Sequence, residues 1–252
     1  MRVFRSVVAP LLGAMAFTGG MQAVQADTIV VYGASGKIGG VIVNEALSRG
    51  HTVIGVSRDP SKLKADNKRF KAVEGDVTEL DSFKKVTQGA DAVIISVSGG
   101  DDKDPKNTTV AKAARVAVQA FTGASKSPEV IQIGGATTVA GTREAMEANL
   151  PPFAKPGTPF YTMVFGHFDA LQTYQASKIR WSVLTPPMDI EGMGRDDKPN
   201  DLKRTGQYRT STSAAVKDAN GKSSVNIADL AVAAVDEAEK HRFVAQRFTV
   251  GY

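Results

Sequence analysis

The sequence predicts a doubly wound α/β fold, a single domain in which a mainly parallel sheet of about seven strands has helices on both faces. Short β-branched runs alternate with longer helical patterns, as in parallel sheets whose crossover connections are helices. A glycine-rich turn joins the first of these runs to the first helical pattern. The last four runs are almost wholly apolar, which is typical of strands buried on both faces.

The expected strands and helices alternate along the chain. Strands are predicted over residues 28–32, 52–56, 70–74, 92–97, 129–133, 181–185 and 247–250. Helices are predicted over residues 38–49, 80–87, 108–122, 165–177 and 228–240. Residues 137–162 and 186–221 lack clear periodicity. Because both stretches follow strands at their carboxyl ends, where open α/β sheets bind ligands, we expect them to be substrate-pocket loops.

Residues 1–26 have the pattern of a secretory signal peptide. Arg2 and Arg5 form a basic start, residues 7–17 are largely apolar, and small residues suited to cleavage precede Asp27. The apolar stretch is shorter than the roughly 20 residues of a membrane span, so a permanent anchor is the weaker alternative. The sequence therefore predicts an exported, periplasmic domain over residues 27–252, with no stable membrane span after cleavage.

The composition excludes several kinds of site. The chain has no cysteine, so disulfides, thiolate metal sites and a thiol nucleophile play no part. Loss of Arg2 and Arg5 lowers the formal charge of +5 by two, and so small an excess argues against nucleic acid as a partner. His51, His167 and His241 lack the spacing of metal ligands, and no metal site is predicted.

The strongest functional signal is the turn after the first predicted strand. Gly33 suits a tight turn, Gly36 lets backbone amides approach a pyrophosphate, and Gly39 lets the helix pack close to the strand. The anion would lie at the positive end of the helix. The sequence thus predicts a Rossmann-type dinucleotide-binding domain, with a glycine turn that binds no ligand as the alternative. The turn consists of Gly33, Ala34, Ser35, Gly36, Lys37, Ile38 and Gly39.

The end of the second predicted strand indicates which dinucleotide is bound. A carboxylate there would bind the ribose hydroxyls of NAD, whereas a cation would bind the 2′-phosphate of NADP. The sequence places Ser57 and Arg58 at this point, with Lys62 nearby, so NADP(H) is favoured over NAD(H). A solvated loop charge is the alternative for Arg58.

Two further segments are expected at the cofactor. Asp76 and Val77 follow the third strand and are predicted to line the adenine pocket, with the carboxylate accepting a hydrogen bond from the exocyclic amine. Ser96, Val97 and Ser98 follow the fourth strand, where small residues let the backbone pass beside the ribose that carries nicotinamide. Ordinary strand-to-helix turns are the alternative for both segments.

Several later segments extend the pattern, namely residues 134–136, 181–187, 204–208, 218–223, 229–233 and 247–252. Through these and the glycine turn, the chain resembles the atypical branch of the short-chain dehydrogenase/reductase superfamily. Within that branch it is similar to the NAD(P)H-binding group of NADH-flavin reductase-like proteins and biliverdin reductase B. The resemblance covers about residues 28–252. It implies that Gly134, Gly135 and Pro186 line the cofactor site.

Two residues are candidates for proton transfer. Tyr174 and Lys178 have the Tyr-x-x-x-Lys spacing that many members of the superfamily use. However, Lys178 falls in the turn that ends the predicted helix, so it should not project with Tyr174 toward the cofactor. His167 is the histidine expected to face the pocket, although packing near a helix start is the favoured alternative. His51 and His241 are expected to be structural.

These observations favour an NAD(P)H-dependent reductase. Without an acid–base pair, the site suits direct hydride transfer from NADPH to a small-molecule acceptor such as a flavin or quinone. A redox sensor that binds NADP(H) without turnover is one alternative, and a carbonyl reductase that uses Tyr174 is another. Export conflicts with the cytosolic source of NADPH, because a chain that crosses the membrane unfolded cannot carry the cofactor with it. Arg2 and Arg5 are not adjacent, so they form no twin-arginine signal. The protein is expected to be a monomer or homodimer.

Overall fold

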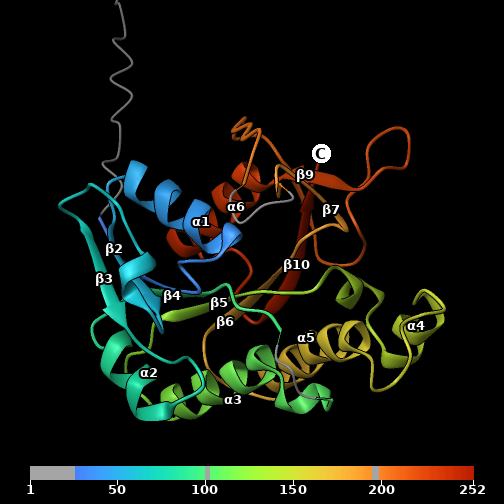
Figure 1. Cartoon of the computed structure of the whole chain (residues 1–252), viewed down its shortest axis with the longest axis horizontal. Coiled ribbons are helices and arrows are strands. Elements are labelled where there is room, and N and C mark those ends of the chain that lie inside the picture. The colour runs from blue at the N-terminus through green and yellow to red at the C-terminus, as the bar shows by residue number, and fades with distance from the viewer. Residues whose placement is uncertain (1–25, 100–102, 195–198) are drawn as a thin grey trace, which may run out of the picture.

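The computed structural model describes residues 26–99, 103–194 and 199–252. The strands that form its main sheet are β1 (Thr28–Tyr32), β2 (Thr52–Ser57), β3 (Phe70–Glu74), β4 (Ala92–Ile95), β5 (Glu129–Ile133), β6 (Trp181–Thr185), β8 (Arg209–Ser211) and β10 (Gln246–Gly251). Their order is β3-β2-β1-β4-β5-β6-β10-β8 (Figure 1). All neighbouring strands are parallel except β8, which pairs antiparallel with β10. The predicted doubly wound, mainly parallel fold is confirmed.

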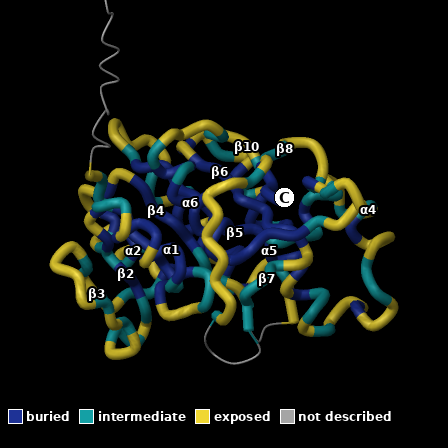
Figure 2. Tube along the Cα trace, turned by 90° about the horizontal axis from the view of Figure 1, so that it is seen from above, coloured by how far each residue is buried: buried dark blue, intermediate teal, exposed yellow. Residues whose placement is uncertain are grey.

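The helices cover both faces of this sheet. They are α1 (Lys37–Ser48), α2 (Leu80–Thr87), α3 (Thr109–Phe121), α4 (Arg143–Ala148), α5 (Pro159–Gln175) and α6 (Ile227–Lys240). Helices α1 and α6 lie on one face, and α2, α3 and α5 lie on the other (Figure 1). Every residue of β4, β5 and β6 is buried between these layers, as the apolar runs predicted (Figure 2).

Helix α5 begins earlier than the sequence analysis placed it. The predicted start at residue 165 is wrong, because Thr158 caps the helix by accepting a hydrogen bond from the backbone amide of Tyr161, and Pro159 occupies its first position. Residues 137–162 therefore contain the short helix α4 and the first turn of α5. Residues 186–221 contain β8 and also β7 (Asp189–Glu191), which pairs parallel with β9 (Ser224–Asn226).

A buried carboxylate ties the C-terminal segments together. Asp229, in the first turn of α6, is fully buried. One of its oxygens accepts hydrogen bonds from the backbone amides of Thr205 and Gly206, at 2.9 and 2.8 Å. The other accepts from the hydroxyls of Thr205 and Tyr252, at 2.7 and 2.8 Å. The segments at residues 204–208, 229–233 and 247–252, which carried part of the family resemblance, thus meet in one network within the fold.

The predicted signal peptide lies almost wholly in residues 1–25, outside the described part of the chain. Among the residues that are described, no helix is both long and apolar enough to cross a membrane.

Two buried carboxyl groups meet at the amino ends of the strands, away from the glycine turn. Glu129 begins β5 and Glu237 lies in the last turn of α6, and both are shielded from solvent. Glu237 accepts hydrogen bonds from the backbone amides of Arg242 and Phe243, and His241 Nδ1 lies 2.7 Å from Glu129 Oε2. Burial, reinforced by the nearby Glu129, raises the pKa of Glu237 to about 7, and burial also raises the pKa of Glu129.

This pair predicts that the protein is less stable at alkaline pH. The folded protein holds the proton of Glu237 more tightly than the unfolded chain does, where the pKa is near 4.5. The resulting stabilisation is complete below about pH 4.5 and is lost as the pH rises through 7, so the free energy of unfolding should fall by about 1–3 kcal/mol over that interval. Glu237→Gln should flatten this dependence in urea unfolding at pH 5 and pH 8. The exposed Glu144→Gln should keep the wild-type slope, and an unchanged slope in Glu237→Gln would contradict the assignment.

Candidate functional site

The first pocket of interest, which we call the outer pocket, lies at the carboxyl ends of β1, β2 and β4. It has a volume of about 340 Å³. It brings together the glycine turn, the end of β2, the turn after β3 and the segment after β4. Its lining residues are Tyr32, Gly33, Ser35, Gly36, Val56, Ser57, Arg58, Gly75, Asp76, Val77, Thr78, Ser96, Val97, Ser98 and Thr109.

The glycine turn depends on two places where backbone segments lie too close together for a side chain to fit between them. Gly33 has φ +74°, and a Cβ on it would lie 2.2 Å from the carbonyl oxygen of Ser96. A Cβ on Gly39 would lie 2.1 Å from the carbonyl oxygen of Gly33, so the first turn of α1 packs directly on the turn. Among the described residues no side chain caps α1, and its first turn has no acidic residue. The positive end of the helix therefore faces the outer pocket without a compensating carboxylate.

The end of β2 presents hydroxyl groups and a cation to the outer pocket. The hydroxyls of Ser35 and Ser57 lie 3.3 Å apart, and Arg58 is exposed at the pocket wall. Lys62 extends toward Asp59 instead, with its Nζ 3.5 Å from a carboxylate oxygen. Of the two predicted cations, only Arg58 lines the outer pocket.

In the turn after β3, one of the two carboxylate oxygens of Asp76 makes local hydrogen bonds. Asp76 Oδ1 accepts hydrogen bonds from the backbone amide and the hydroxyl of Thr78, at 2.8 and 2.7 Å. Asp76 and Val77 both line the outer pocket, where the sequence analysis placed the adenine. Tyr32, which the sequence analysis did not single out, lines the same pocket with a buried hydroxyl that lacks a partner among the described residues, while its ring stacks on Phe83.

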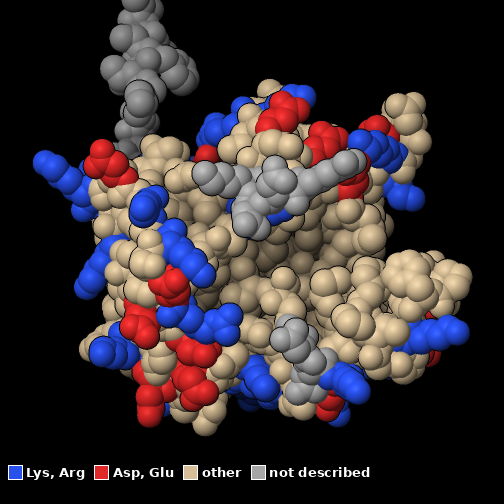
Figure 3. All heavy atoms as spheres, viewed as in Figure 1, with Lys and Arg blue, Asp and Glu red and all other residues tan. Residues whose placement is uncertain are grey.

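A second pocket, the inner pocket, continues from the first and also has a volume of about 340 Å³. The two share Gly36 and the segment from Ser96 to Ser98. Figure 3 shows a hollow between the β7 and α5 sides of the molecule, and the described residues at its border are mainly uncharged. The inner pocket is lined by Gly36, Lys37, Ile38, Ser96, Val97, Ser98, Ile133, Gly134, His167, Pro186, Ile190 and Met193. Only the second of the two predicted pocket loops reaches it, and no residue of 137–162 lines either pocket.

Three residues of the predicted cofactor set lie behind these walls. Ala34 is buried and lines a smaller cavity of about 230 Å³ on the other side of the turn. Gly39 is inside the turn, where it permits the close packing of α1. Gly135 backs onto His167, because a Cβ at Gly135 would lie 3.0 Å from the Cβ of that histidine.

His167 lies in the inner pocket, two turns into α5 and not near its start as predicted. Its Nδ1 is buried without a hydrogen-bond partner in the described chain. Burial lowers the pKa of His167 to about 4, so the imidazole is neutral at physiological pH. Among the described residues that line this pocket, Lys37 alone has a charged side chain, and its Nζ donates a hydrogen bond to the carbonyl oxygen of Gly194 at 3.1 Å.

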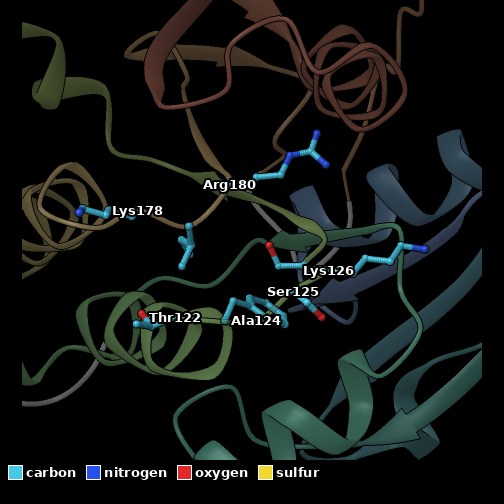
Figure 4. A pocket seen from close by; sticks show the side chains of 10 residues that line it. Thr122, Ala124, Ser125, Lys126, Lys178 and Arg180 are labelled. Atoms are coloured by element: carbon cyan, nitrogen blue, oxygen red, sulfur yellow. The ribbon is translucent and has the colours of Figure 1, made fainter.

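The Tyr-x-x-x-Lys candidates do not meet at either pocket. Tyr174 is fully buried, stacks on Trp181, and donates a hydrogen bond to Gln132 at 3.4 Å. Burial raises the pKa of Tyr174. Lys178 lines a larger cavity of about 510 Å³ at the amino ends of the strands, where Lys126, Lys178 and Arg180 point away from one another (Figure 4). The geometry therefore offers Tyr174 no contact with a substrate.

The two remaining histidines have structural contacts. His51 is fully buried, with its Nε2 2.9 Å from a carboxylate oxygen of Glu239. His241 ends α6 in the left-handed conformation and contacts Glu129.

Comparisons with known proteins bear on this site. A sequence model of the NAD(P)H-binding family matches residues 33–239. A candidate epimerase from Bacteroides thetaiotaomicron is 29% identical, with a TM-score of 0.71 and coverage of 90% of this chain and 98% of that one. A candidate exported protein from Burkholderia pseudomallei is 26% identical, with a TM-score of 0.69 and coverage of 90% and 100%. A candidate NADH-flavin reductase from Streptococcus pneumoniae shares the fold at 24% identity, with a TM-score of 0.68 and coverage of 90% and 99%.

Proposed function

The chain belongs to the NAD(P)H-binding family, and from that membership we propose that it binds NADP(H) across the outer and inner pockets and transfers hydride to a small flavin or quinone. One observation carries the proposal. The two pockets join at Gly36, where the uncapped positive end of α1 suits a pyrophosphate. In this arrangement the outer pocket holds the adenosine half of the cofactor and the inner pocket holds the nicotinamide half.

The preference for NADP(H) rests on Arg58. It is the cation at the end of β2 that lines the outer pocket. The carboxylate of the neighbouring Asp59 accepts a hydrogen bond from the backbone amide of Ser61 and forms an ion pair with Lys62. A guanidinium suits the 2′-phosphate, which NAD lacks.

Arg58→Ala should therefore weaken NADPH binding about 10-fold and leave NADH binding within about twofold. Fluorescence titration of both nucleotides would measure the two dissociation constants. Lys62→Ala serves as the matched control, because this neighbouring cation faces Asp59 and should leave the NADPH constant nearly unchanged. An equal loss for NADPH and NADH in Arg58→Ala would contradict the preference.

Hydride transfer to an acceptor that needs little protonation fits the inner pocket. The candidate tyrosine is in the core, and the pocket wall is mainly apolar. When bound, NADPH supplies the hydride, and the chain's own part is to position the two reactants and to exclude water.

The test is to follow the loss of NADPH absorbance after adding menadione, FMN or a simple ketone. Oxidation with menadione or FMN supports the proposal. Oxidation with the ketone alone would favour a carbonyl reductase. Tight binding of NADPH without oxidation by any acceptor would favour a redox sensor and overturn the catalytic part of the proposal.

Export is part of the same proposal. Residues 1–26 have the signal pattern, and the Burkholderia relative is described as an exported protein. N-terminal sequencing of the protein from cells should find a chain that begins near Asp27, and an intact Met1 would contradict export.

A further inference from the structure

The backbone nitrogen of Asp27 occupies a defined place in the fold, just before β1. It donates a hydrogen bond to Nδ1 of His51 at 3.2 Å. The next amide, of Thr28, donates to Oδ2 of Asp91 at 2.9 Å, whereas the preceding residue, Ala26, is exposed. The fold therefore holds the chain in place from the nitrogen of Asp27 onward, and this nitrogen directly follows the small residues suited to cleavage.

His51 connects this nitrogen to a carboxylate on α6. Its side chain is fully buried, and its Nε2 lies 2.9 Å from Oε1 of Glu239. The other oxygen of Glu239 pairs with Arg49 at 2.9 Å. Because Nδ1 accepts the hydrogen bond from Asp27, the ring is a neutral imidazole whose proton is on Nε2, and Nε2 donates it to Glu239. The imidazole thus presents a lone pair to the nitrogen of Asp27.

The charges near Asp27 favour a cation at this place. Partial burial raises the pKa of the Asp27 carboxyl, and Asp91 and Glu239 add to that rise, whereas His51 and His241 act in the opposite direction. None of these four neighbours is a lysine or an arginine. A positive charge on the nitrogen of Asp27 would lie near carboxylates and against the lone pair of His51, so it would stabilise the folded chain.

We propose that export cleaves the chain between Ala26 and Asp27 and that the α-ammonium group so formed donates a hydrogen bond to Nδ1 of His51. This inference rests on the proposed export. Hydrolysis of the peptide bond by a signal peptidase consumes one water and leaves a carboxylate on Ala26 and an ammonium on Asp27. The uncleaved chain has an uncharged amide at the same place. The cleaved chain is therefore more stable than its precursor, which suits a chain that crosses the membrane unfolded.

Two chains that begin at different residues test the effect of the charge. One begins at Asp27 and the other at Val24, and each is released from a fusion partner by a protease that leaves no extra residue. In both chains the nitrogen of Asp27 has a proton to donate to His51, but only the first chain places an ammonium there. The chain that begins at Asp27 should unfold at a temperature about 2–4 °C higher. Equal unfolding temperatures would overturn the inference.

Asp91→Asn tests the carboxylate nearest in sequence to the new terminus. Asparagine keeps an oxygen that accepts from the amide of Thr28 but loses the negative charge, so the difference between the two chains should fall by about half. Glu144→Gln makes the same kind of change at an exposed residue of α4 and should leave the difference as it is. An undiminished difference in Asp91→Asn would overturn the assignment of the site.

Sequencing the amino terminus of the protein recovered from cells separates this inference from the proposed export. A first residue of Asp27 supports both. Cleavage at any other bond would overturn the inference and leave export standing, because the ammonium would then lie away from His51. An intact Met1 would overturn the proposed export itself.

Discussion

Gly39→Ala should abolish measurable NADPH binding and destabilise the protein by about 1–3 kcal/mol or more. The added Cβ would lie 2.1 Å from the carbonyl oxygen and 2.7 Å from the carbonyl carbon of Gly33, so backbone atoms must move to accept it. The only relief is to shift α1 away from β1, which displaces the helix amides from the outer pocket. Urea unfolding and NADPH titration would measure the two effects.

Gly40→Ala is the matched control, because it makes the same chemical change one residue later in the same helix. A Cβ there would lie 3.5 Å from the carbonyl oxygen of Ala34, which is an ordinary contact. Since alanine favours helix more than glycine does, this variant should be neutral or more stable by about 0.5–1 kcal/mol, with NADPH binding intact. Equal behaviour of the two variants would contradict the account of the turn.

The second large effect is expected at the start of α6. Asp229→Ala should lower the free energy of unfolding by about 3–5 kcal/mol, because it leaves the amides of Thr205 and Gly206 and the hydroxyls of Thr205 and Tyr252 without their acceptor. Chemical denaturation at neutral pH would measure this loss.

Asp218→Ala is the control that separates the effect of losing a buried acceptor from the effect of losing any aspartate. Asp218 also accepts hydrogen bonds from two backbone amides, of Asn220 and Lys222, but these bonds are exposed and water can replace them. The expected loss is below about 1 kcal/mol. A loss as large as that of Asp229→Ala would show that the buried network contributes no more than a surface turn.

The sequence predicted the central strands well for a physical reason. A parallel strand buried on both faces must be apolar along its whole length, so the pattern is local and strong. The edge strand β8 was not predicted, because three polar residues, Arg209 to Ser211, become a strand only through their pairing with β10. The early start of α5 was missed although its signal was present in the adjacent Thr158 and Pro159.

The residues of the candidate site also differ in whether local sequence or tertiary packing places them. The glycine turn and the end of β2 are contiguous in sequence with the strands that place them, so their meeting at the outer pocket followed from the fold pattern. Ile190 and Met193 reach the inner pocket from a stretch without periodicity, and only tertiary packing brings them there. Tyr174 illustrates the opposite error, because its spacing to Lys178 suggested chemistry while its helix face packs into the core.

The central claim is that the glycine turn of this chain forms a nicotinamide nucleotide site, and equilibrium titration of the purified protein with NADPH and NADH tests it most directly. The account predicts saturable binding of one NADPH per chain, tighter than that of NADH by about 10-fold and lost in Gly39→Ala. Failure of both nucleotides to bind a folded wild-type protein would contradict it.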